Sequence, residues 1–146
     1  MPQQNGRNTE VFAYRFILND LELLGWNIKS PSQQASGQVY TQRQCLDNEH
    51  IAEQLVQMHP ENVVKISEND FYVIEAKRER EQLEQALSEA KDDYATKINK
   101  SHNVKARIIS GVAGNENDGY LVKSQFLEND GRFKTIKSNK YASKQL

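Results

Sequence analysis

The chain of 146 residues is expected to fold as a single mixed α/β domain, with helices packed against one central sheet. Three observations predict this class. Apolar residues recur at helical spacing in three segments, short apolar runs between turn residues are typical of strands, and the two kinds of segment are interspersed along the chain. Hydrophobic residues make up 37% of the chain and charged residues 27%, which suits one buried core with a polar surface.

Three segments have the apolar spacing of helices that bury one face. The first is expected to span residues 9–24 and to end at Gly25. The second is expected around 48–58, and the third is a long helix over 79–97 that we expect to pack across the sheet. The residues expected to face inward are Val11, Tyr14, Leu18 and Leu21 in the first helix, Ile51, Leu55 and Met58 in the second, and Leu83, Ala86, Leu87, Ala90 and Tyr94 in the third.

Strands are expected where short apolar runs are bounded by turn residues. Residues 27–45 are rich in Ser, Gln and Asn and are expected to form a long loop with a short strand at 38–40. The glycine-rich segment 111–119 is expected to be a mobile turn; no Gly-Lys-Ser/Thr follows it, so it is not a phosphate-binding loop. Turns at 67–70 and 128–131 predict two hairpins. The main strands are expected at 62–66, 71–77, 104–110, 120–127 and 132–136.

The net charge of −1 hides an uneven distribution along the chain. Residues 1–96 contain 9 Lys/Arg against 16 Asp/Glu, whereas residues 97–146 contain 10 against 4. A basic segment beside an acidic cluster can attract phosphates next to a metal site. The other interpretation of the basic C-terminal end is a solvated tail.

Several functional classes find no support in the sequence. No apolar run approaches the roughly 18 residues of a membrane helix, and the first six residues lack the pattern of a signal peptide. The single cysteine, Cys45, allows no disulfide within the chain and no thiolate cluster. The three histidines lack zinc-ligand spacing. We therefore expect a cytoplasmic protein with no membrane partner.

The most informative pattern is Pro60-Glu61, then thirteen residues, then Glu75-Ala76-Lys77. Hydrolysis of a phosphodiester with Mg²⁺ needs oxygen ligands close together, and a nearby cation offsets charge at the attacked phosphate. Glu75 and Lys77 are two residues apart on an expected strand, so both side chains leave the same face. The hairpin returns Glu61 to the same end of the sheet, and the backbone carbonyl of Ala76 is a further candidate ligand.

The register of this hairpin decides whether Glu61 reaches the other two side chains. A four-residue loop places Glu61 opposite Ala76, on the wrong face, whereas a five-residue loop or a bulge places it opposite Lys77 and diagonal to Glu75. The nuclease interpretation requires the second arrangement. The alternative interpretation is a strand that runs out of the core into solvent, because a bare Glu-x-Lys is a common sequence.

A family resemblance extends over most of the chain. The motif region resembles the nuclease core of type I restriction subunits, and resembles more closely the N-terminal domain of fused restriction–modification enzymes classed as N-6 adenine DNA methylases. The matching stretches are Pro60-Glu61-Asn62-Val63-Val64-Lys65, Tyr72-Val73-Ile74-Glu75-Ala76-Lys77-Arg78, Leu23-Leu24-Gly25-Trp26, Ser36-Gly37-Gln38-Val39-Tyr40, Gln82-Leu83-Glu84-Gln85-Ala86, Ile109-Ser110-Gly111-Val112-Ala113-Gly114-Asn115 and Asp118-Gly119-Tyr120-Leu121-Val122. The resemblance implies a PD-(D/E)xK nuclease with a restriction-endonuclease-like fold, in which helices flank a central mixed sheet.

The same resemblance implies domain limits and residue roles. The nuclease-like domain is expected over residues 1–137, followed by a basic tail or the start of a linker over 138–146. Glu61 stands where the family has a metal-binding Asp, and its side chain is longer by one methylene. Glu75 is implied as the second metal ligand and Lys77 as the catalytic lysine. The implied cofactor is Mg²⁺, with Mn²⁺ as a substitute.

Glu10 and Tyr94 match two further positions of the family. Glu10 corresponds to an auxiliary acidic residue that can bind metal through water; a carboxylate favoured in the first turn of a helix is the alternative explanation. Related type I subunits carry Gln-x-x-x-Tyr on the helix after the lysine. Tyr94 matches the Tyr, but position 90 is Ala90, which leaves Gln82 or Gln85 as a substitute.

Arg78 and Arg80 follow the motif directly. They are candidate contacts to DNA phosphates. The alternative is that they are ordinary residues at the start of a helix, paired with Glu81 and Glu84.

These observations together predict a Mg²⁺-dependent endodeoxyribonuclease domain of a restriction–modification system, acting on double-stranded DNA. The family chooses its targets with separate methylase and specificity domains, and the chain has no Asn-Pro-Pro-Tyr-type motif and no glycine-rich cofactor loop. A methylase or specificity partner is therefore expected, and the chain is expected to be a detached N-terminal portion or a stand-alone protein. The alternatives are a catalytically impaired DNA-binding or assembly module, and a structural partner domain that binds no divalent ion.

Overall fold

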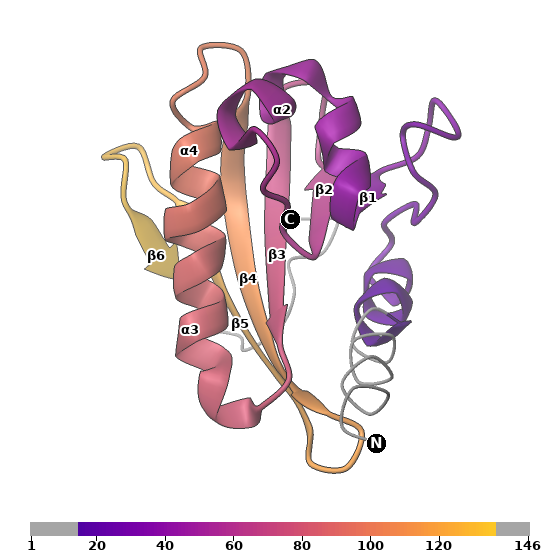
Figure 1. Ribbon diagram of the computed structural model, residues 1–146, viewed down its shortest axis with the longest axis vertical. Coiled ribbons are helices and arrows are strands. Elements are labelled where there is room, and N and C mark those ends of the chain that lie inside the picture. Colours follow the sequence, from indigo (N-terminus) through magenta and orange to yellow (C-terminus); the bar gives the residue numbers. More distant parts are fainter. Residues whose placement is uncertain (1–14, 137–146) are drawn as a thin grey trace.

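The computed structural model describes residues 15–136, which form one sheet with helices on both of its faces (Figure 1). A helix over residues 15–23 comes first. It is followed by β1 (Val39–Thr41), the 3-10 helix η1 (Gln42–Asp47), α2 (Glu49–Leu55), β2 (Asn62–Lys65), β3 (Asp70–Lys77), the 3-10 helix η2 (Arg80–Gln82), α3 (Leu83–Glu89), the π-helix η3 (Ala90–Ala95), α4 (Thr96–Ile98), β4 (Lys105–Asn115), β5 (Gly119–Leu127) and β6 (Phe133–Thr135).

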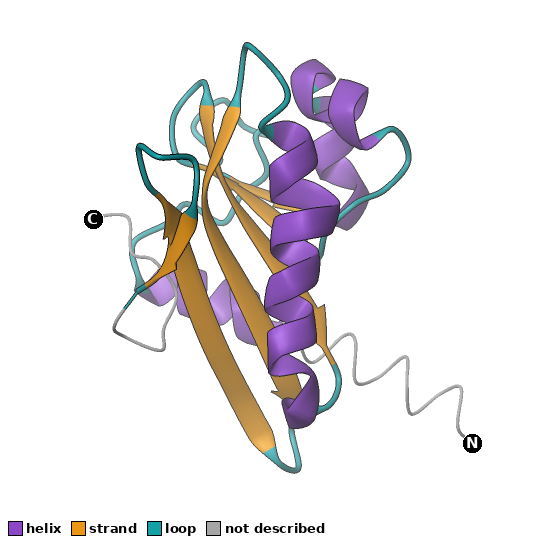
Figure 2. Ribbon diagram, turned by 90° about the vertical axis from the view of Figure 1, so that its left-hand side faces the viewer, coloured by secondary structure: helices purple, strands orange, loops and turns teal. Residues whose placement is uncertain are grey.

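The strands lie in the order β1-β2-β3-β4-β5-β6. β3 and β4 are parallel, whereas the other neighbouring pairs are antiparallel. A parallel pair needs a connection that crosses back over the sheet, and the helical run from η2 to α4 provides it. Figure 2 shows this run lying along one face of the sheet. The structure therefore confirms a mixed α/β domain with the long helix packed across a central sheet.

Each face of the sheet buries its own apolar cluster, because side chains alternate between faces along a strand. One cluster packs the helical run and α2 against the sheet, and the other packs the helix of residues 15–23 against it. The first cluster includes Val63, Phe71, Val73, Leu87, Tyr94 and Ile98. The second includes Ile17, Leu21, Trp26, Val64, Tyr72 and Ile74.

The first helix ends as the sequence predicts, at Gly25. This residue has a φ of 99°, a conformation that glycine adopts without a steric penalty. Its N–H donates to the carbonyl of Glu22 at 3.0 Å, and the N–H of Trp26 donates to the carbonyl of Leu21 at 3.1 Å. These two bonds form a Schellman motif, which closes the helix and turns Trp26 into the core.

Some sequence-based expectations fall outside the described residues. They are the part of the first helix before residue 15, with its inward-facing Val11 and Tyr14, the auxiliary acidic residue Glu10, and the tail over 138–146.

Two loop predictions were wrong. Residues 42–45, expected as the end of a long loop, belong to η1, where the side-chain oxygen of Gln44 accepts hydrogen bonds from the Thr41 N–H at 3.0 Å and hydroxyl at 2.7 Å. Residues 111–115, expected within a mobile turn, continue strand β4. Gly111 serves close packing instead of a turn, because a Cβ atom there would lie 2.5 Å from the backbone nitrogen of Leu87 in α3.

The second helix is shorter than the apolar spacing predicts. Asn48 caps α2 by accepting bonds from the N–H groups of His50 and Ile51, and the helix ends at Leu55. Met58 therefore lies beyond the helix and is 39% exposed, contrary to the prediction that it faces the core. In the described part of the chain, no helix has the length and apolar character needed to cross a membrane.

Candidate active site

The predicted motif lies at the end of β3. Glu75 and Lys77 alternate with Ile74 and Ala76, so they point to the face covered by α3 and η3, where Val73 is buried. The carboxylate and the lysine thus continue an apolar stripe, as the sequence predicts.

The hairpin register differs from both arrangements considered from the sequence. Asn62 pairs with Ile74, so the preceding residue, Glu61, falls opposite Glu75. The prediction that Glu61 lies opposite Lys77 was therefore wrong. The cause is a tighter turn, in which the N–H of Ile66 donates to the carbonyl of Asp70 at 2.9 Å and only residues 67–69 remain in the loop. A shift by two residues keeps the side chain of Glu61 on the side of the sheet that the nuclease interpretation requires.

Glu75 is a buried carboxylate, 9% exposed. Its Oε1 accepts two backbone hydrogen bonds, from the N–H of Glu61 and from its own neighbour Ala76, each at 3.1 Å. Burial raises the pKa of Glu75 from 4.5 to about 7; the charge of Glu61 adds to this rise, whereas the two N–H donors and Lys77 oppose it. The side chain can therefore hold or release a proton near neutral pH.

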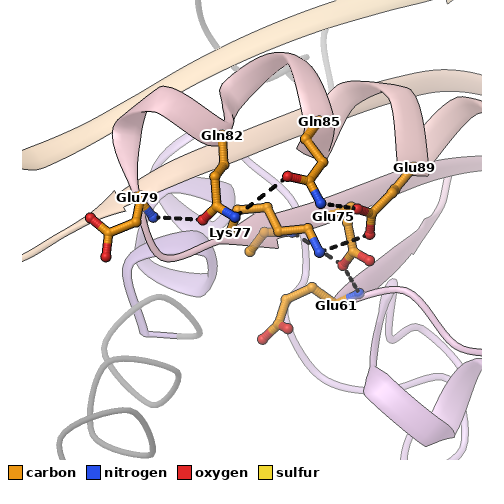
Figure 3. A network of polar contacts seen from close by, with 8 residues as sticks. Glu61, Glu75, Lys77, Glu79, Gln82, Gln85 and Glu89 are labelled. Carbon is orange, nitrogen blue, oxygen red and sulfur yellow. Dashed lines mark hydrogen bonds and ion pairs between the residues drawn. The ribbon is translucent and has the colours of Figure 1, made fainter.

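Glu61 faces the same end of the sheet with a different orientation. Figure 3 shows its backbone nitrogen turned toward Glu75, while its carboxylate extends away from the Glu75 carboxylate. The side-chain amide of Gln42 donates to Glu61 Oε2 at 3.4 Å. The two carboxylates remain close enough for the charge of Glu61 to act on Glu75.

Lys77 is held by an acidic residue of the helix above it. Its Nζ lies 2.9 Å from Oε1 of Glu89, and only 26% of the lysine side chain and 24% of the glutamate side chain are exposed. Oε2 of Glu89 accepts a hydrogen bond from the side-chain amide of Gln85 at 2.9 Å (Figure 3). The lysine is thus fixed beside Glu75 by contacts from α3.

Tyr94, in η3, lies beside Glu75 on the helix side of the site. It is 8% exposed, and both burial and the neighbouring Glu75, through its charge and a side-chain hydrogen bond, raise the pKa of the Tyr94 hydroxyl. The structure therefore places Tyr94 beside Glu75. Position 90, where the family has Gln, is the small buried Ala90. Gln85 contributes its side chain to the polar network through Glu89.

The remaining predicted residues lie at the edge of the site. The N–H of Ala76 contacts Glu75, but no contact defines its carbonyl as a ligand. Arg78 and Arg80 are exposed beyond the end of β3. Glu84, one of the two acidic residues that the alternative interpretation pairs with these arginines, forms an ion pair with Lys123 at 2.8 Å.

Sequence reasoning missed Glu89. The sequence carried one signal, because Glu89 follows Gln85 by four residues, a spacing at which helix side chains meet. Nothing in the sequence linked Glu89 to Lys77, since that contact depends on the position of α3 over the sheet.

The carboxylates at this end of the sheet are those of Glu61, Glu75 and Glu89, and Glu89 is paired with Lys77. Over residues 15–136, no three or more His, Cys, Asp or Glu side chains form a group that could by itself hold a metal ion. A cation bound here would draw its remaining ligands from backbone carbonyls, water or a substrate, as Mg²⁺ commonly does.

Comparisons with protein-family models, curated proteins and solved structures find no match to this chain. The molecule is thus defined as a mixed α/β protein with a buried carboxylate and a fixed lysine at one end of its sheet. Its function must be argued from that site.

Proposed function

We propose that this chain is the Mg²⁺-dependent endonuclease domain of a restriction–modification system, with a restriction-endonuclease-like fold, and that it hydrolyses phosphodiester bonds in double-stranded DNA. The main support is one observation: Glu61, just before β2, lies opposite Glu75 near the end of β3 and donates its backbone N–H to the Glu75 carboxylate, with Lys77 fixed beside them. Two carboxylates and one lysine at the end of a hairpin match the PD-(D/E)xK pattern that the sequence resembles.

The residues present fit a hard divalent cation. Burial of Glu75 disfavours its charged form, and the negative charge of Glu61 adds to this effect. A cation would replace the proton that Glu75 otherwise binds near neutral pH, since carboxylates bind metals in their ionised form. Glu61 and Glu75 would hold the ion, and the carbonyl of Ala76 is a candidate third ligand. When bound, such an ion polarises a phosphate and lowers the pKa of a water molecule.

The remaining side chains have separate tasks. The ammonium group of Lys77 stabilises negative charge that develops on the attacked phosphate. Glu89 holds that ammonium group in place, and Tyr94 covers Glu75 on the helix side. The exposed Arg78 and Arg80 lie next to the site and would contact the DNA backbone.

The test is cleavage of supercoiled plasmid DNA with Mg²⁺ or Mn²⁺. Wild-type protein should convert the plasmid to nicked and linear forms, and Lys77→Ala should reduce the rate by about 100-fold or more. The matched control is Lys123→Ala, which removes a lysine from the comparable ion pair with Glu84 and should leave cleavage unchanged. Absence of cleavage by the wild type, or equal cleavage by Lys77→Ala, contradicts the proposal.

A second candidate is a catalytically impaired DNA-binding or assembly module that works with a methylase or specificity subunit. It is favoured by two contacts, because Lys77 and Glu61 already have partners within the protein, namely Glu89 and Gln42. This candidate predicts DNA binding in a gel-shift assay without metal-dependent cleavage.

A further inference from the structure

Lys77 is held by a chain of side-chain contacts that runs along the helix above it. From the start of η2, the N–H of Glu79 donates to Gln82 at 3.1 Å, Gln82 donates to Gln85 at 3.4 Å, and Gln85 donates to Glu89 at 2.9 Å. Glu89 then meets the Lys77 ammonium group at 2.9 Å. Figure 3 shows these residues in sequence over the end of β3.

This chain of contacts restricts the orientation of the Glu89 side chain through both of its carboxylate oxygens. One oxygen of its carboxylate meets Lys77 and the other accepts from Gln85, so both are occupied. A carboxylate fixed at both oxygens constrains the ammonium group more strongly than one that rotates freely, because less side-chain entropy remains to be lost.

The π-helix explains why one helical run serves both sides of the site. In a regular α-helix, Glu89 and Tyr94 would point about 140° apart, given 3.6 residues per turn. η3 follows Glu89 directly, and its i→i+5 bonds, such as that from the Thr96 N–H to the Lys91 carbonyl, bring residues five apart toward one face. Glu89 can therefore meet Lys77 while Tyr94 meets Glu75.

A neighbouring ion pair shows what distinguishes this contact. Lys123 and Glu84 also join a strand to α3, at 2.8 Å, but 72% of the Glu84 side chain is exposed. Glu89 is 24% exposed and has a second hydrogen bond from Gln85. Solvent screens the first pair strongly and the second much less, so only the second holds its lysine firmly.

We propose that Glu89 is the positioning residue of this site: it fixes the Lys77 ammonium group beside Glu75, and Gln85 in turn fixes Glu89. The catalytic consequence rests on the proposed nuclease function, but the contact itself does not. In this role Glu89 acts through Lys77, which makes it a positioning residue and not a catalytic one.

The first arm of the test measures how readily Lys77 reacts, without any assay of cleavage. The full chain is treated with limiting acetic anhydride at pH 8, and acetylation of each lysine is followed by mass spectrometry. Glu89→Gln keeps the shape of the side chain and should raise acetylation of Lys77 about 3-fold or more, since a neutral amide holds the amine less firmly. The matched control Glu84→Gln should leave acetylation of Lys77 unchanged and alter that of Lys123 little, because solvent already screens that pair.

The second arm measures DNA cleavage in the same variants. Glu89→Gln should lower kcat about 10-fold with KM little changed, because a misplaced lysine weakens stabilisation of the transition state and not DNA binding. Gln85→Ala should have a smaller effect in the same direction, Glu89→Asp should restore part of the rate, and Glu84→Gln should match the wild type.

The two arms distinguish failure of the positioning role of Glu89 from failure of the proposed nuclease function. Unchanged acetylation of Lys77 in Glu89→Gln overturns the positioning role, whatever the cleavage result. Cleavage that stays equal or rises in Glu89→Gln also overturns it, and a rise would identify the ion pair as inhibitory. If the wild type cuts no DNA, the proposed nuclease function fails, while the acetylation arm still decides whether Glu89 holds Lys77.

Discussion

The two faces of β3 and β4 both bury polar side chains, but the surroundings of these side chains differ. On the face that packs against the helix of residues 15–23, the hydroxyl groups of Tyr72, Ser110 and Ser124 form a chain of hydrogen bonds. Each is fully buried and has a partner of the same kind. On the face under α3, Glu75 is 9% exposed, and its carboxylate accepts two backbone hydrogen bonds but also lies within the influence of a second negative charge, that of Glu61.

This difference separates a structural polar group from a functional one. Buried hydroxyl groups that hydrogen-bond to one another need no ligand, and they stabilise the fold by about 1 kcal/mol per bond. A buried carboxylate that also feels a second negative charge is unfavourable in its charged form and is stabilised by a proton or a cation. The first face is therefore expected to govern stability, and the second to govern binding and catalysis.

The largest expected effect is on activity, from Glu75→Gln. The amide keeps the shape of the side chain but cannot act as an anionic ligand, so plasmid cleavage with Mg²⁺ should fall by about 100- to 1,000-fold. The control is Tyr72→Phe on the other face, which should cut DNA at nearly the wild-type rate. Comparable losses in both variants would show that the two faces do not differ as described.

The second effect concerns the pH dependence of stability. The folded-state pKa of Glu75 is about 7 and its ordinary value is 4.5, so the folded protein binds the proton more tightly than the unfolded chain. The associated stability is fully present below pH 4.5 and is lost as the pH rises to about 7, by about 3 kcal/mol in total. Urea unfolding between pH 4 and 8 measures this fall.

Two comparisons sharpen the pH experiment. Glu75→Gln should remove most of the fall, because the amide does not titrate; an unaltered slope would assign the effect to other groups. Mg²⁺ should stabilise the wild type at pH 8 more than at pH 5, since at low pH the proton competes for the same carboxylate. The Glu75→Gln variant should show no such difference.

The third effect comes from Gly111, which lies opposite Glu75 on the adjacent strand. A Cβ atom at this position would lie 2.5 Å from the backbone nitrogen of Leu87, so Gly111→Ala must displace α3. We expect a loss of about 2 kcal/mol in the free energy of unfolding, together with reduced cleavage, since Glu89 moves with the helix. Urea unfolding measures the loss in the free energy of unfolding. The control is Ser88→Ala on the exposed side of α3, whose free energy of unfolding should lie within about 0.5 kcal/mol of the wild-type value.

The smallest effect is expected on the hydroxyl chain. Tyr72→Phe removes one hydrogen bond and leaves Ser110 with Ser124, so unfolding should become easier by about 1 kcal/mol. Tyr120→Phe is the matched control, because the buried Tyr120 hydroxyl has no hydrogen-bond partner among the described residues. That second variant should be neutral or slightly stabilising, and equal losses in the two would contradict this view.

Local sequence patterns were sufficient to predict much of the fold and part of the site. Alternation along 71–77 placed Glu75 and Lys77 on the face of Val73, and the apolar spacing over 79–97 identified the helix that crosses the sheet. Gly25 marked the end of the first helix. These features are encoded within a few residues, since side-chain periodicity and glycine conformation are local properties.

Other features depended on contacts between distant segments. The tight turn over 67–69 set Glu61 opposite Glu75, because pairing with β3 fixed the register and loop composition did not. Gly111 belongs to a strand and not a turn, because α3 packs directly on it.

The sequence by itself therefore determined which residues carry charge and which face of β3 they share. Only the tertiary structure decided that Glu75 is buried beside Glu61 and that Glu89 holds Lys77. The physical reason is that desolvation and ion pairing depend on what surrounds a side chain, and those surroundings include residues distant along the chain, such as Glu61, fourteen positions before Glu75.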